Sequence, residues 1–159
     1  MSRRDVEISL KSTLDKLMGD LAVSLSTGKP VFSFDLDDPA NEREIQAGSD
    51  HALVYQYNSL AEEPRHPLYS ASFLIGAKTT DDPGNYQMAD LLVDLRDLFK
   101  VGDSYPVSDW SEVEEGAAAP EESGVLIIKS VQSTPQSFEK QSGIRLMQVQ
   151  AQLISYGED

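Results

Sequence analysis

The chain has 159 residues, of which 40% are hydrophobic and 25% charged, and this composition fits a single globular domain spanning residues 1–159. Its net charge of −14 repels phosphate backbones and so excludes tight, direct binding to nucleic acid. The absence of cysteine excludes disulfides and thiolate metal sites, and no run of about 18 apolar residues is present to cross a bilayer.

The first predicted element is an amphipathic helix at residues 5–25, which ends at Gly28 and Pro30. Its apolar stripe follows the helical spacing. The stripe consists of Val6, Leu10, Leu14, Leu17, Leu21 and Leu25. The opposite face carries charged residues that are expected to face water, namely Glu7, Lys11, Asp15 and Lys16.

Three strands are predicted next, because short runs of apolar and aromatic residues alternate between turn-forming segments. They occupy residues 31–34, 51–60 and 68–78. The third strand alternates most clearly, and its better core face holds Tyr69, Ala71, Phe73, Ile75 and Ala77.

A second amphipathic helix is predicted at residues 86–99 and is followed by a long acidic loop at 101–124. The loop holds seven acidic residues and neither lysine nor arginine. Loops longer than about 12–15 residues are usually functional or disordered. Trp110 within this loop indicates that part of it docks on another surface, so Trp110 is a candidate docking residue.

Two further strands are predicted, one opening at Val125 and one at residues 143–156. The last is the longest period-two segment of the chain. Met147, Val149, Ala151 and Leu153 are expected to face the helices, and the glutamines between them to face a neighbouring subunit, since that face is uncharged. The candidate subunit interface is Gln148, Gln150, Gln152, Ile154 and Tyr156.

The order of these elements predicts an α+β fold. Its mainly antiparallel sheet is expected to have about five strands, with the two helices packed on one face.

Catalytic and metal-binding patterns are missing from the sequence. His51 and His66 are the two histidines, and neither has a carboxylate or cysteine at ligand spacing for zinc. The glycine and glutamate that a calcium loop requires do not follow Asp35 and Asp37 at their places. Neither a glycine-rich phosphate loop nor a nucleophile turn is present. We therefore expect a protein that is not an enzyme and that uses no cofactor or metal.

The order of elements resembles that of the tail terminator, or tail completion, proteins of long-tailed bacteriophages. The resemblance covers nearly the whole chain and is one of layout, without a short diagnostic signature. It is carried by the helix 5–25, the strand opening Pro30-Val31-Phe32, the strand 68–78 leading through Asp81-Asp82-Pro83 into the helix 86–99, and the closing run Gly143 to Tyr156 with its Arg145 to Ala151 core.

This resemblance implies a homo-oligomeric ring, usually a hexamer, that stops polymerisation of the tail tube and offers a docking surface to the head or neck. The implied partners are the tail tube protein and a neck or connector protein, and the implied location is the virion, assembled in the host cytoplasm. Genome DNA would pass through an acidic pore without sequence-specific binding. Candidates for the lumen or rim are Asp35, Asp37, Asp38, Glu112, Glu114 and Glu115.

Other functions stay open at this point. A neck or head-completion protein of the same virion would also be small, acidic and ring-forming. A tail tube subunit must in addition stack on itself, which a terminator does not. Outside virions, the composition also fits a small cytosolic adaptor or an unrecognised hydrolase.

Overall fold

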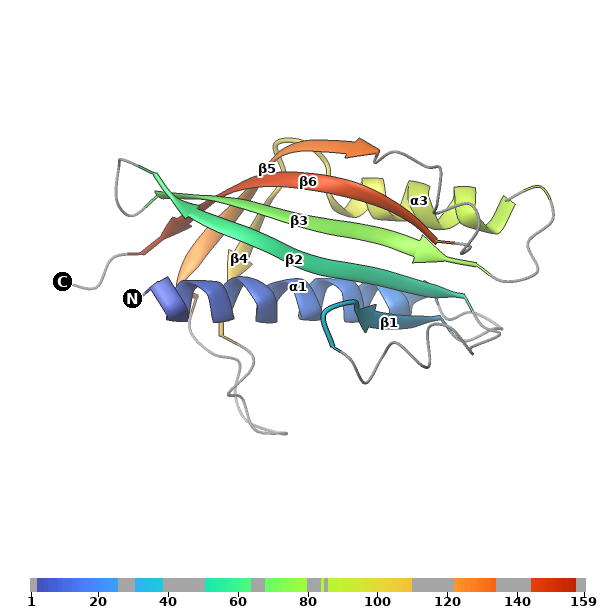
Figure 1. The fold of residues 1–159 in the computed structure, drawn as a ribbon, viewed down its shortest axis with the longest axis horizontal. Coiled ribbons are helices and arrows are strands. Elements are labelled where there is room, and N and C mark those ends of the chain that lie inside the picture. The colour runs from blue at the N-terminus through green and yellow to red at the C-terminus, as the bar shows by residue number, and fades with distance from the viewer. Residues whose placement is uncertain are drawn as a thin grey trace.

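The computed structural model confirms the predicted α+β class: two helices accompany a six-stranded, mixed, mostly antiparallel and curled sheet (Figure 1). It describes residues 3–25, 31–38, 51–63, 68–79, 84, 86–109, 122–133 and 144–156. The elements are α1 (Arg3–Leu25), β1 (Phe32–Asp35), β2 (Ala52–Glu62), β3 (Leu68–Lys78), α3 (Tyr86–Leu98), β4 (Ser104–Val107), β5 (Gly124–Ser133) and β6 (Ile144–Ser155).

The sheet has the strand order β1-β2-β3-β6-β5-β4. β1 pairs with β2 in parallel, and the other neighbouring strands pair antiparallel. The closing strand β6 lies inside the sheet, where it pairs with β3 from Leu68↔Ile154 to Lys78↔Ile144 and with β5 on its other side. The most regular stretch of the sequence is therefore the strand that joins the two halves of the sheet.

β4 corrects the prediction of one continuous loop over residues 101–124. Ser104–Val107 pairs with β5, from Ser104↔Ile127 to Val107↔Gly124. The strand is short and contains Pro106, and proline is tolerated on an edge strand because one side of that strand needs no donor. Only two of its residues, Tyr105 and Val107, turn toward the core, which is too few to produce a visible alternation.

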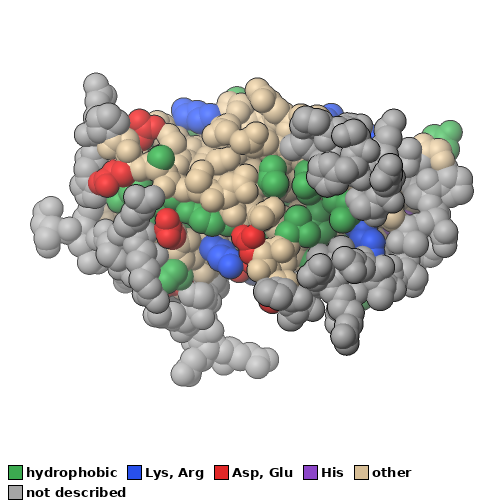
Figure 2. Space-filling view, in the orientation of Figure 1, with side chains coloured by type: hydrophobic (Ala, Val, Ile, Leu, Met, Phe, Trp, Pro, Cys, Tyr) green, Lys and Arg blue, Asp and Glu red, His purple; other side chains and the backbone are tan. Residues whose placement is uncertain are grey.

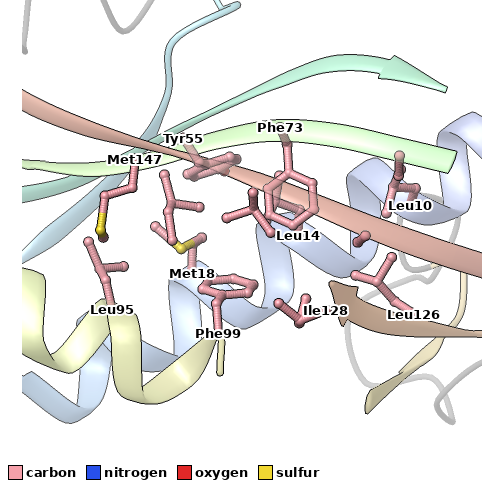
Figure 3. Close-up of a cluster of buried hydrophobic side chains, with 14 of the residues drawn as sticks. Leu10, Leu14, Met18, Tyr55, Phe73, Leu95, Phe99, Leu126, Ile128 and Met147 are labelled. Carbon is pink, nitrogen blue, oxygen red and sulfur yellow. The ribbon is translucent and has the colours of Figure 1, made fainter. Parts of the chain in front are cut away.

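Both helices pack on the same face of the sheet, as predicted, and one hydrophobic core lies between them and the sheet (Figures 1 and 3). The predicted inward residues of β6 are all buried there, as is the predicted core face of β3. The Phe73 and Phe99 rings meet edge to face with centroids 5.7 Å apart, so they connect β3 to the end of α3.

The stripe on α1 follows the prediction only over its first half. Val6, Leu10 and Leu14 are buried, but Met18 and Ala22 continue the row in place of Leu17 and Leu21. The buried residues are four apart. Rows of this spacing are inclined to the helix axis, so the buried row winds around the helix instead of running straight along it. The leucines at 17, 21 and 25 are partly buried against the same core.

Candidate subunit interface

The face of the sheet turned away from the helices, called here the outer sheet face, is built from three cross-strand rows of uncharged side chains. Each row crosses β2, β3, β6 and β5 in register. The rows are Gln56-Leu74-Gln148-Gln132, Ser59-Ser72-Gln150-Ser130 and Ala61-Ser70-Gln152-Ile127. Figure 2 shows this face: uncharged side chains occupy its middle over β3, β5 and β6, and charged ones lie toward its margins.

The three glutamines predicted for the interface therefore share one face, opposite the buried residues of β6. Gln150 is exposed, while Gln148 and Gln152 are half-buried. Gln148 Nε2 donates to Ser72 Oγ at 3.3 Å, which orients that amide across the strand pair. An amide offers both donors and acceptors, so this face can hydrogen-bond to another polar surface without carrying charge.

Ile154 and Tyr156 extend the candidate interface toward the end of β6. Ile154 is half-buried between Leu68 of β3 and Val125 of β5, so that end of the outer sheet face is apolar. Tyr156 is 45% exposed, and its hydroxyl donates to Glu122 Oε2 at 2.7 Å. This hydrogen bond raises the pKa of Tyr156. The ring is thus held in place at the margin of the face.

The acidic candidates at the end of β1 differ in their surroundings: Asp35 makes contacts within the fold, whereas Asp37 and Asp38 are exposed. Asp35 forms an ion pair with Lys11 of α1 at 3.2 Å and accepts the backbone N–H of Asp37 at 2.9 Å, so it fixes β1 and its turn. Asp37 Oδ1 accepts a hydrogen bond from Gln56 Nε2 at 3.0 Å, which places this carboxylate at the β2 margin of the outer sheet face.

The candidates Trp110, Glu112, Glu114 and Glu115 lie outside the described residues. The described residues on either side of them are held together. Val107 O accepts from Ser123 N at 2.7 Å and from Ser123 Oγ at 3.0 Å. Ser108 N donates to Thr13 Oγ1 at 3.2 Å, and that hydroxyl donates to Ser108 O at 3.3 Å. The hairpin of β4 and β5 is therefore tied to α1 at the end where the segment connecting the two strands begins.

Asp15 lies on the exposed side of α1, as predicted, but its carboxylate also forms a hydrogen bond with the Tyr55 side chain that the sequence did not reveal. Desolvation by burial raises the pKa of Asp15, while a hydrogen bond with the Tyr55 side chain acts in the opposite direction. Burial, together with the same hydrogen bond, raises the pKa of Tyr55 well above its ordinary value. The partners are forty residues apart, so neither periodicity nor local spacing signals the pair.

Asp15→Asn is expected to raise the free energy of unfolding at neutral pH. Because the folded pKa of Asp15 lies above the ordinary value of 3.8, its contribution to stability is complete below that pH and is lost as the pH rises through the raised pKa. Asparagine keeps a hydrogen-bonding group and removes the charge. Urea unfolding midpoints at pH 7 and pH 3 measure the effect, which should vanish at the lower pH.

The matched control for Asp15→Asn is Asp20→Asn on the same helix. Asp20 forms an exposed ion pair with Lys16 at 3.0 Å. Exposed pairs of this kind contribute about 0.3–0.5 kcal/mol, so the control should lower stability slightly. A lower midpoint for Asp15→Asn at neutral pH would contradict the prediction, because the ionised carboxylate would then stabilise the fold through Tyr55.

Among the described residues, histidine, aspartate and glutamate form no group of three or more that could hold a metal ion. No helix in the described part of the chain is long and apolar enough to cross a membrane. No protein-family model matches the chain, and no curated protein matches it.

Proposed function

We propose that this chain is a structural virion protein that caps the tail tube of a long-tailed bacteriophage as a ring, stops polymerisation of the tube and provides the docking surface for the head or neck. Its partners would be further copies of itself, the tail tube protein and a neck or connector protein. It would use no cofactor and carry out no catalysis.

The uncharged middle of the outer sheet face is the observation that supports this proposal most strongly. A chain with a net charge of −14 has ample charge to cover its surface, yet three rows across four strands carry none. The rows mix amides and hydroxyls with leucine and isoleucine, and the middle of a protein contact is likewise depleted of charged residues. Such a face suits a protein that assembles with other proteins.

The acidic remainder of the molecule fits a ring through which DNA passes. Exposed carboxylates repel phosphate groups, so DNA would move past them without binding. Among the described acidic candidates, Asp37 and Asp38 are exposed and are the better choices for a rim. Asp35 forms an ion pair with Lys11 and accepts a hydrogen bond from the backbone of Asp37, so its main role would be structural.

Removing the protein from the phage that encodes it tests the proposed function. Electron microscopy should then show tails of uncontrolled length, because nothing stops the tube from growing. Supplying the protein from a plasmid should restore the normal length. Purified protein added to polymerising tail tubes should halt elongation and appear as a ring at one end.

Two outcomes would contradict this role in different ways. Tails of normal length that carry no heads would instead assign the protein to the neck or to head completion. Unchanged particles and unchanged infectivity would remove the virion role altogether.

A further inference from the structure

The outer sheet face differs in charge from the other exposed surfaces of the described structure. The exposed side of α3 is mostly acidic, with Asp90 and Asp97 beside Arg96, whereas the exposed side of α1 carries both signs, namely Lys11, Asp15, Lys16 and Asp20.

Among the described residues of the outer sheet face, carboxylates lie at the margins: Asp37 accepts from Gln56 and Glu63 accepts from Ser70 near β2, and Glu122 accepts from Tyr156 at the end of β6. Lys129 is exposed on β5 at the register shift between Ile128 and Ser130, beside the second row. The middle of the face, over β3, β6 and β5, has no carboxylate in its rows.

This distribution bears on which partner can use the face. A basic partner would gain most from the acidic surfaces and would form no ion pairs with these rows. A second copy of the chain has the opposite requirement, because both copies carry a charge of −14 and contact through their acidic surfaces would bring like charges together. The uncharged rows are where two copies can approach without that repulsion.

The chemistry of the face also suits contact between copies. Gln132 and Gln150 are exposed in neighbouring rows, and each amide carries donors and an acceptor. Half-buried apolar residues lie beside them, including Leu74 in the first row and Ile127 in the third. Amides can therefore satisfy one another across a contact while the apolar residues leave water.

The accessible part of the face fits a weak contact. Beyond Leu74, the outer-face residues Val54, Gly76 and Lys78 are buried, so the accessible stretch of β3 is Leu68–Leu74, roughly 23 Å long at about 3.3 Å per residue. Four strands at about 4.8 Å spacing give a width of roughly 19 Å. The projected area is then roughly 440 Å², about half of the ~800 Å² that each partner contributes to a standard interface, so copies of the chain should associate weakly.

We infer that the outer sheet face contacts a second copy of this chain, with Gln132 and Gln150 near its centre, and that it does not contact the tail tube protein. This inference deepens the proposed function and rests on it for the ring itself. It assigns the contact between subunits to β5 and β6 and leaves the acidic surfaces of α3 and of the turn after β1 for other partners.

The test is the double variant Gln132→Glu and Gln150→Glu. Each change keeps the shape of the side chain and adds one negative charge, so the outer sheet face of every copy acquires two charges. Gln87→Glu is the matched control, because Gln87 is exposed on α3 outside the outer sheet face. Sedimentation of the full chain at concentrations up to the millimolar range measures association of copies.

The wild-type protein should associate weakly as its concentration rises. The double variant should need at least a tenfold higher concentration for the same degree of association, and the control should behave as wild type. Added salt should partly restore association of the double variant, because salt screens exposed charges over about 10 Å at 0.1 M. Circular dichroism verifies that each variant is folded.

Two results would overturn the inference. They are a wild-type chain that stays monomeric at millimolar concentration and a double variant that associates as wild type does. If that double variant also no longer caps tail tubes, the face would be assigned to the tube protein and the proposed function would stay intact. Failure of the wild-type chain to cap tubes would instead count against the proposed function.

Discussion

Gly76→Ala is expected to destabilise the fold by more than the ~1–3 kcal/mol that overpacking usually costs. Gly76 lies in β3 between Val54 of β2 and Leu146 of β6. A Cβ at this position would overlap the Arg145 carbonyl oxygen and come within 2.8 Å of Leu146 Cδ2. The carbonyl belongs to the backbone of β6, so relief requires β3 and β6 to separate. Urea unfolding followed by circular dichroism measures the loss.

Gly19→Ala is the control for Gly76→Ala. Gly19 lies inside α1, where a Cβ would meet only Ser33 Oγ at 4.0 Å. Alanine should therefore stabilise the helix by about 0.5–1 kcal/mol, because it restricts the unfolded chain more than glycine does. The prediction for Gly76 fails if Gly76→Ala unfolds at or above the wild-type midpoint, since β3 and β6 would then tolerate the added atom.

Elements with a long, regular pattern were predictable from the sequence. β6 alternates over twelve residues, which fixes the face of Met147 and Val149 without knowledge of its neighbours. The two helices were predicted from rows of apolar residues, and the α+β class followed from their order among the strands. In each case the signal lies within one segment.

Features that depend on contacts between distant segments were not predictable. The parallel pairing of β1 with β2 and the insertion of β6 between β3 and β5 are choices of partner, and one strand's alternation does not encode its partner. The same reason explains why the hydrogen bond between Asp15 of α1 and Tyr55 of β2 was not predicted. β4 was missed because its inward residues are only Tyr105 and Val107.

The candidate interface was predictable only in part. The alternating positions of Gln148, Gln150 and Gln152 predicted that one face of one strand is polar and uncharged. The cross-strand partners Gln132, Ser130 and Ser72 make it a surface, and they come from segments whose register only the fold supplies. A glutamine-rich strand thus predicts a polar face, while its neighbours decide whether that face is charged.

Phe99→Ala is expected to lower the free energy of unfolding by about 3–5 kcal/mol, the usual cost of removing a buried phenylalanine. Phe99 is fully buried and meets Phe73 of β3 at 5.7 Å and Tyr105 of β4 at 6.2 Å between ring centroids. Its loss opens a cavity where α3, β3 and β4 meet (Figure 3). Small domains have a total stability of about 5–15 kcal/mol, so thermal and urea unfolding should show a large shift.

Phe99→Leu and Val93→Ala separate the causes of that loss. Leucine retains much of the buried volume, so Phe99→Leu should cost less than Phe99→Ala. Val93 lies on α3 but is 56% exposed, so its truncation should change stability by no more than about 0.5 kcal/mol. Equal losses at positions 93 and 99 would contradict the prediction, because Val93 is exposed and alanine is the better helix former at that position. A loss confined to Phe99 would mean that the aromatic contacts fasten α3 and β4 to the sheet and so support β5, which carries Gln132 of the proposed subunit contact.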